Sequence, residues 1–194
     1  MENTLFTASA VQRTLQNLKS TTSVRLDQIP NLLLKSLAFE LSHRLCHIFD
    51  MSFKCQQLPQ VWKHAFVTPV FKNGTTSEAN NYRSIYLTCT CCRVMERIIN
   101  KQLLHYLLEH RLITKEQHGI IQRKSVCGNL LESLCDCTVN SESRLITDVV
   151  YIEFKKAFDS VSHTKLLPKL QTYGICGDLL GWITFFSVHS NSVC

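Results

Sequence analysis

The spacing of apolar residues changes along the chain, and this change limits the possible folds more than any other feature of the sequence. Val11, Leu15 and Leu18 recur at helical spacing. After Pro30 a longer apolar stripe follows, made of Leu33, Leu34, Leu37, Leu41, Leu45, Ile48 and Phe49. Apolar residues that recur every three or four positions indicate a helix with one buried face. The first third of the chain is therefore predicted to be helical, with Pro30 opening the longer helix.

The middle of the chain combines strand and helix patterns. Residues 61–72 are rich in β-forming residues, are interrupted by Pro69 and run into Asn73-Gly74. Because proline cannot donate to a central ladder of hydrogen bonds, this segment is predicted to be an edge strand that leads into a turn. Residues 93–109 then carry apolar residues at helical spacing, which predicts a long amphipathic helix.

The last third of the chain is predicted to be a strand followed by helices. The apolar run Val149 to Ile152, within Asp148 to Phe154, suits a buried strand. A helix is expected after His163, ending near Gly174, and Pro168 fits it only just after the first turn. The pattern as a whole predicts an α+β fold, and 194 residues suffice for one globular domain, or for one and a piece of the next.

Charge and composition narrow the classes of function. The formal net charge of +6 favours an anionic partner, nucleic acid included. No apolar run approaches the roughly 20 residues needed to cross a bilayer, and residues 1–10 lack the basic and apolar stretches of a secretory leader. We therefore expect no membrane association, no secretion and an intracellular location, nuclear or cytoplasmic, with the ten cysteines reduced.

Two groups of residues are candidates for chemistry. Glu153 ends the predicted strand, where a carboxylate can hold a hard divalent cation, although spacing alone favours an ordinary surface carboxylate. The second group is a set of sulfur and imidazole ligands for zinc: Cys89, Cys92, Cys135 and Cys137, with His105 or His118 as substitutes. The Cys135–Cys137 spacing does not match a zinc ribbon, which makes zinc the weaker hypothesis.

A series of short phrases occurs in a characteristic order. They are Trp62–Ala65, Phe71–Gly74, Asn81–Thr88, Cys92–Ile99, Gln117–Gly119, Asn129–Leu131, Tyr151–Asp159, Tyr173–Ile175 and Leu180–Ile183. In this order and spacing they resemble the reverse transcriptases of non-LTR (LINE-type) retrotransposons, from about Leu32 to the end of the chain. Each phrase alone is a weak signal, and the ordered series carries the resemblance.

The resemblance implies a right-hand polymerase fold, here as fingers plus an incomplete palm. Its division would be a helical N-terminal extension at residues 1–58, fingers at 59–145 and the start of a palm at 146–194. It also implies RNA-directed DNA polymerase activity, in which deoxynucleotides are added to a primer 3′-hydroxyl by two-metal catalysis with Mg²⁺ or Mn²⁺. The implied partners are an RNA template and a DNA primer.

The resemblance also implies roles for single residues. Glu153 stands at the catalytic metal-binding position with the Phe154 carbonyl beside it, and Phe158 is the aromatic gate that excludes ribonucleotides. Arg83 matches the arginine that grips the incoming triphosphate, and Lys72 is a second phosphate ligand or a solvated turn residue. Five cations are candidates for template or primer phosphates, or are solvent-facing charges: Arg93, Arg97, Lys101, Arg123 and Lys124.

Departures from the family pattern bear on activity. Glu153 replaces the family's aspartate, which moves the carboxylate outward by roughly an ångström. The 194 residues contain no adjacent Asp-Asp pair, which supplies the remaining metal ligands in the family. We therefore predict a truncated fragment that does not polymerise by itself, binds metal weakly at best and associates through an exposed palm edge. The alternative is a non-catalytic nucleic-acid-binding remnant, or a pseudogene product without selected function.

Overall fold

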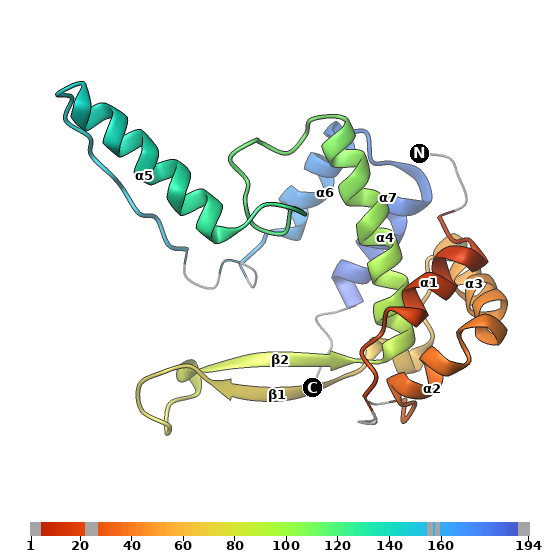
Figure 1. The fold of residues 1–194 in the computed structure, drawn as a ribbon. Coiled ribbons are helices and arrows are strands. Elements are labelled where there is room, and N and C mark those ends of the chain that lie inside the picture. The colour runs from red at the N-terminus through yellow and green to blue at the C-terminus, as the bar shows by residue number, and fades with distance from the viewer. Residues whose placement is uncertain (1–4, 22–26, 155–156, 158–159, 190–194) are drawn as a thin grey trace. The chain divides into compact units, whose positions relative to one another are not determined.

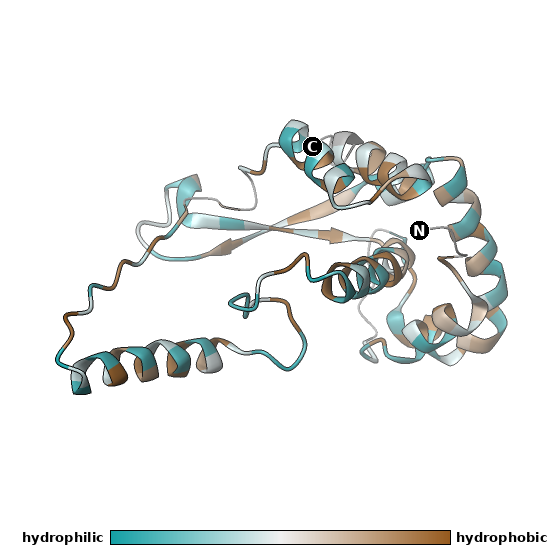
Figure 2. Ribbon diagram, turned by 90° about the horizontal axis from the view of Figure 1, so that it is seen from above, coloured by the Kyte–Doolittle hydropathy of each residue, from teal (hydrophilic) through white to brown (hydrophobic). Residues whose placement is uncertain are grey.

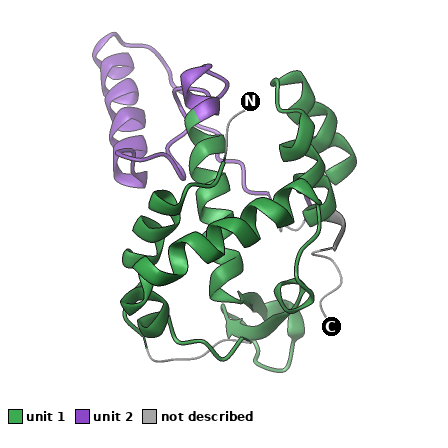
Figure 3. Ribbon diagram, turned by 90° about the vertical axis from the view of Figure 1, so that its right-hand side faces the viewer, with its two compact units in different colours: residues 1–105, 163–194 green, residues 106–162 purple. Residues whose placement is uncertain are grey.

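The computed structural model describes residues 5–21, 27–154, 157 and 160–189 (Figure 1). By packing, the chain divides into two compact units (Figure 3). Unit 1 comprises residues 1–105 and 163–194, and unit 2 comprises residues 106–162. The boundaries at residues 58 and 145 follow the family's division and stay a prediction.

The helical first third is confirmed, but the longer helix is broken in two. Helices α1 (Ala8–Gln16), α2 (Asn31–Ser36) and α3 (Ala38–Lys54) occupy it, and Pro30 directly precedes α2 as expected. Leu37 separates α2 from α3, with φ −96° and ψ 23°. Because the axis breaks there, the predicted stripe does not lie on one face. Three residues of the predicted stripe, Leu33, Leu37 and Ile48, are exposed, so their predicted burial was wrong. Ala38 and Ser42, which the stripe did not include, are buried.

Aromatic rings join the start of the chain to α3. The Phe6 ring lies 5.6 Å from the Phe49 ring and 5.8 Å from the Phe53 ring, centroid to centroid. Phe49 also meets Trp62 edge-on at 5.8 Å. Offset and edge-on pairs at these distances are favourable beyond the area that they bury. Together with Val11 and Leu15 of α1, both fully buried, the rings form the core between α1 and α3.

Strands β1 (Ala65–Phe71) and β2 (Tyr82–Thr88) form an antiparallel pair. The strand predicted around Pro69 is confirmed. In a two-stranded sheet both strands are edges, so the missing N–H of Pro69, opposite Ser84, breaks no central ladder. Two short 3₁₀ turns, Gln60–Lys63 and Ala79–Asn81, precede the two strands.

Three helices complete unit 1. Helix α4 (Thr90–Glu109) confirms the predicted amphipathic helix and starts at Thr90 rather than Arg93, and its last residues belong to unit 2. Helix α6 (His163–Thr172) is also confirmed, with Pro168 just after the first turn and Gly174 beyond its end at φ +81°. Helix α7 (Gly177–His189) follows and packs against α3 and α6.

Unit 2 contains α5 (Val126–Glu142) and an extended segment after it. Residues 145–154 have no regular secondary structure, and Val150 and Ile152 are 80% and 75% exposed. Figure 2 shows hydrophobic residues in brown along this segment. The predicted buried strand at 148–154 is therefore wrong. A strand needs a hydrogen-bonded neighbour, and the only described strands, β1 and β2, pair with each other in unit 1.

The described fold is thus a mixture of helices with one small sheet, in keeping with an α+β fragment. None of the described helices has both the length and the apolar composition needed to span a bilayer.

Candidate nucleotide and nucleic-acid interface

The β1–β2 hairpin places Lys72 and Arg83 on one face. Arg83 pairs with Val70, and the Lys72 N–H donates to the Asn81 carbonyl at 2.8 Å, which extends the ladder by one pair. Directly opposed residues of an antiparallel pair share a face, and so do residues two apart in one strand. Lys72 and Arg83 are therefore diagonal neighbours, whose Cα atoms lie roughly 7–8 Å apart in such pairs.

This face of the hairpin is cationic. Its other residues are the uncharged Phe66, Thr68, Val70, Asn81, Ile85 and Leu87. Both Lys72 and Arg83 are exposed, and neither belongs to an ion pair within the described part of the chain. The Glu78 carboxylate lies near this face, with Oε2 3.5 Å from Asn81 Nδ2. Two neighbouring cations outside any ion pair form a site that suits a polyanion.

The loop between the strands is held by side chains. Asn81 Nδ2 donates to the Thr75 carbonyl at 2.8 Å, and the Tyr82 hydroxyl donates to the Thr76 carbonyl at 2.9 Å. Gly74 has φ +89°, and a Cβ added there would lie 2.5 Å from Asn81 Nδ2. The closely packed loop fixes the ladder pair that carries Lys72. Sequence reasoning had placed Gly74 in a turn but had assigned no structural role to Asn81 or Tyr82.

Helix α4 presents a row of cations. Arg93, Arg97 and Lys101 are four residues apart and all exposed, while Val94, Met95, Ile98 and Ile99 are buried on the opposite side. Side chains four apart in a helix lie on the same face. With a rise of 1.5 Å per residue, the row extends about 12 Å along the axis. The structure thus groups these three of the five predicted nucleic-acid contacts.

The buried start of α4 holds thiols and one carboxyl. The Cys92 N–H donates to Cys89 Sγ and the Cys92 thiol to Glu96 Oε1, both at 3.3 Å. Burial raises the pKa of Cys91 to about 12, and it also raises the pKa of the Glu96 carboxyl despite the hydrogen bond from Cys92 and the nearby Arg93. A hydrogen bond from Cys92 lowers the pKa of Cys89. Cys91 is therefore neutral near pH 7, and Glu96 is less acidic than an exposed carboxyl.

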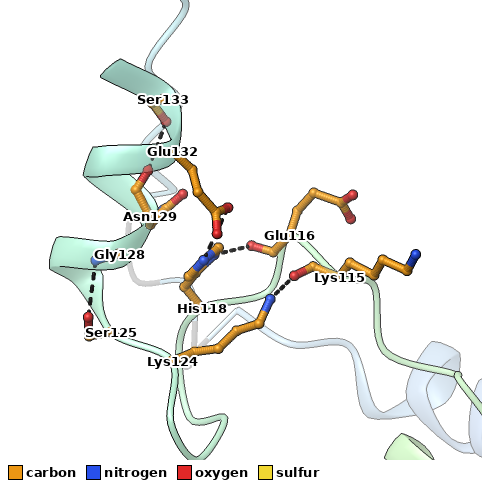
Figure 4. A network of polar contacts seen from close by, with 9 residues as sticks. All are labelled: Lys115, Glu116, His118, Lys124, Ser125, Gly128, Asn129, Glu132 and Ser133. Atoms are coloured by element: carbon orange, nitrogen blue, oxygen red, sulfur yellow. Dashed lines mark hydrogen bonds and ion pairs between the residues drawn. The ribbon is translucent and has the colours of Figure 1, made fainter. Parts of the chain in front are cut away.

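The other two predicted nucleic-acid contacts, Arg123 and Lys124, lie in unit 2 next to a network of polar contacts (Figure 4). The Lys124 ammonium donates to the Lys115 carbonyl, and Arg123 is exposed with φ +68°. The buried His118 ring has Nδ1 2.8 Å from the Glu116 carbonyl oxygen and Nε2 3.3 Å from Glu132 Oε2. This network, which ties the loop to α5, is a feature that sequence reasoning missed.

The start of α5 is capped by a side chain. The Ser125 hydroxyl accepts a hydrogen bond from the Gly128 N–H at 3.0 Å, as a helix N-cap does. The cap follows directly after Arg123 and Lys124, so it holds the end of the loop that bears them.

The predicted metal position lies in the exposed segment of unit 2. Glu153 and Phe154 are both exposed and outside any helix or strand, and Phe158 lies outside the described residues. Mg²⁺ and Mn²⁺ prefer several oxygen ligands, commonly more than one carboxylate. Across the described ranges, no three His, Cys, Asp or Glu side chains gather closely enough to hold a metal ion. Glu153 therefore belongs to no such group within the described ranges.

The same search bears on the zinc hypothesis. Cys89 and Cys92 lie at the buried start of α4 in unit 1, whereas the exposed Cys135 and half-buried Cys137 lie on α5 in unit 2. The Glu96 carboxyl lies beside Cys92, but among the residues described no three His, Cys, Asp or Glu side chains form a group that could hold a metal ion. Zinc gains no support from this geometry.

A known sequence family matches the part of the chain that contains β2 and the basic amphipathic helix α4. Residues 70–192 match the family described as "Reverse transcriptase (RNA-dependent DNA polymerase)". The match covers 123 of the 194 residues, including β2, the row on α4 and the segment with Glu153. The chain therefore belongs to the reverse transcriptase family.

Its relatives are polymerases of non-LTR retrotransposons. The chain is 26% identical over 147 residues to the probable RNA-directed DNA polymerase from transposon BS of Drosophila melanogaster, covering 75% of this chain and 16% of that protein. It is 30% identical over 130 residues to the Pol polyprotein from retrotransposable element R2 of Popillia japonica, covering 66% and 17%. It is 25% identical over 144 residues to the RNA-directed DNA polymerase from mobile element jockey of D. melanogaster, covering 74% and 16%. The chain spans about a sixth of the length of these curated relatives.

Proposed function

We propose that this chain is a reverse transcriptase segment that binds the phosphates of an incoming deoxynucleotide and of a template–primer, and that these 194 residues do not polymerise by themselves. The supporting observation is that Lys72 and Arg83 share one face of the β1–β2 hairpin and that neither is in an ion pair among the described residues. Family membership supplies the reaction class, RNA-directed DNA synthesis.

Arg83 and Lys72 have different tasks in this proposal. The planar guanidinium of Arg83 binds two phosphate oxygens at once, which orients the triphosphate. The ammonium of Lys72 is a point charge at the start of the loop, and it adds attraction with less control of geometry. Arg83→Lys should therefore impair binding more than Lys72→Arg.

Binding of a fluorescent deoxynucleoside triphosphate tests these roles. We expect Arg83→Gln to weaken binding about tenfold, since one charge-assisted interaction contributes roughly 1.5–3 kcal/mol when well formed and less when exposed. Arg44, an exposed arginine of α3, provides the matched control as Arg44→Gln. Equal affinities for Arg83→Gln and the unchanged chain would exclude the hairpin as the triphosphate site.

We propose the lack of polymerisation because a two-metal site needs several oxygen ligands. When bound, two metal ions in such an enzyme activate the primer hydroxyl and stabilise the leaving pyrophosphate. Glu153 is one carboxylate on an exposed segment, and among the described residues it belongs to no group of three or more potential metal ligands. Primer extension on an RNA template with Mg²⁺ or Mn²⁺ should show no incorporation, either for this chain or for Glu153→Asp. Incorporation above the background of a protein-free reaction would refute the proposal.

We further propose that the exposed apolar segment of unit 2 promotes association of copies. Residues Val149 to Phe154 expose unpaired backbone together with apolar side chains, the combination that templates strand pairing. Size-exclusion chromatography with light scattering should show species larger than a monomer. Val150→Lys and Ile152→Lys should reduce them, and a monodisperse monomer would contradict the expectation.

A further inference from the structure

Unit 1 contains a basic hollow between its N-terminal helices and α4. Its volume is about 420 Å³, within the range of roughly 300–1,000 Å³ typical of ligand sites. Lys19, Arg93 and Arg97 line it, together with uncharged polar residues and two apolar ones. No described acidic residue is among its lining. Three cations thus line one cavity, and no described carboxylate is part of its lining.

The walls of the hollow are held by hydrogen bonds between distant parts of the chain. The Thr90 hydroxyl donates to Asn31 Oδ1 at 2.8 Å, joining the start of α4 to the start of α2. The Leu32 N–H donates to the Thr21 carbonyl at 3.2 Å, which holds the segment after α1 against α2. Lys19 lies on that segment, so its place beside α4 follows from these links.

Two carboxyl groups lie next to lining residues of the hollow, Asp27 beside Thr90 and Glu96 near Arg93. The Asp27 carboxylate accepts the Thr90 N–H at 3.2 Å, and Glu96 accepts the Cys92 thiol. Neither lines the hollow. The three lining cations outnumber these two carboxyl groups, so an anion with several acceptor oxygens is the ligand that this chemistry favours.

The cations continue beyond the hollow. Arg93 and Arg97 lie on its wall, and Lys101 follows one turn later on the same exposed face of α4. Such a row, about 12 Å long, matches a chain of phosphates better than a single small anion.

We propose that the hollow binds a backbone phosphate of a single nucleic-acid strand, which continues along α4 past Lys101. Lys19 is the new element, because it brings the segment after α1 into the nucleic-acid interface. The inference rests on the proposed function in so far as the strand belongs to a template or primer. Since the contact is to phosphate, RNA and DNA of one sequence should depend on Lys19 to the same degree.

The experiment is fluorescence anisotropy of the full chain with labelled 12-nucleotide single strands, RNA and DNA, across a salt series. Each lost phosphate contact should reduce the slope of log affinity against log salt concentration by about 0.7. At 0.1 M salt the same loss should weaken the affinity about fivefold. We expect this reduction for Lys19→Gln and Arg97→Gln, and recovery for Lys19→Arg. Arg44→Gln is the control, and because all these residues are exposed, melting temperatures should be unchanged.

Comparing the Lys19 variant, the hairpin variant and inorganic phosphate distinguishes failure of the inference from failure of the proposed function. If Lys19→Gln matches Arg44→Gln while Lys72→Gln/Arg83→Gln still loses triphosphate binding, the inference is wrong and the proposed function stands. If Lys19→Gln weakens strand binding and the hairpin variant keeps its triphosphate affinity, the proposed function fails and the inference stands. If millimolar inorganic phosphate saturates the hollow and strand affinity does not depend on Lys19, the site takes a free anion and the inference is overturned.

Discussion

Replacement of Gly74 by alanine tests the physical basis of the cationic hairpin. Gly74 has φ +89°, a region that L-residues enter at a cost of roughly 1–2 kcal/mol. The new Cβ would lie 2.5 Å from Asn81 Nδ2 and 2.9 Å from Asn81 Cγ, so the Asn81 side chain must move. Moving it breaks the hydrogen bond to the Thr75 carbonyl, worth about 0.5–1.5 kcal/mol. The two effects together destabilise the hairpin loop by about 1.5–3.5 kcal/mol.

Amide hydrogen exchange measures this loss at one site. The Lys72 N–H donates to the Asn81 carbonyl at 2.8 Å, so its exchange reports opening of the loop end of the hairpin. A loss of about 1.5–3.5 kcal/mol corresponds to roughly 10- to 300-fold faster exchange, at 1.4 kcal/mol per factor of ten. Triphosphate affinity should fall with it, because Lys72 leaves its fixed position beside Arg83.

Two further variants isolate the cause. In an Asn81→Ala background the clash is absent, so Gly74→Ala should cost only the backbone strain. Gly119→Ala is the control, since its nearest contact would be Gln117 Nε2 at an ordinary 3.5 Å. If Lys72 exchanges at the same rate in Gly74→Ala as in the unchanged chain, the loop does not hold the hairpin and the reasoning is refuted.

Three predictions concern the core of unit 1. Phe49→Ala removes a fully buried ring that contacts Phe6 and Trp62, so urea denaturation should show a loss of about 3–5 kcal/mol, and a loss below 1 kcal/mol would contradict the packing. Cys91, with its pKa raised to about 12, should react with iodoacetamide at pH 8 far more slowly than an exposed cysteine, as peptide mass spectrometry would show; equal rates would mean that α4 opens readily. Because burial raises the pKa of Glu96, its contribution to stability is fully present below the ordinary value of 4.5 and is lost as pH rises through the folded value. Glu96→Gln should therefore stabilise the protein relative to the unchanged chain at pH 8 and not at pH 4, and an equal gain at both values would contradict this sign.

The spacing of apolar residues predicted secondary structure correctly where a single helix buries one face. The spacing of Val94 and Ile98 predicted α4, and these residues are buried in the structure. The same reasoning failed at Leu37, because apolar spacing does not reveal a break in the helix axis. It failed again at Asp148–Phe154, because an apolar run becomes a strand only where another strand pairs with it.

Family membership was apparent from sequence, since the ordered phrases need no spatial information and the comparison bears them out. The roles assigned to Arg83, Glu153 and Phe158 came with the family and remain predictions. The shared face of Lys72 and Arg83 required the pairing of β1 with β2, because a shift of one residue in register would place them on opposite faces.

The sequence by itself determined the family of this protein, its helical first third and the basic row on α4, because these depend on residue order and on contacts within a few positions. Only the tertiary structure decided that Lys19 lies beside Arg93 and Arg97, more than seventy positions away in the chain. Contacts of that separation arise from hydrogen bonds and packing between elements, such as Thr90 with Asn31, and no local pattern encodes them.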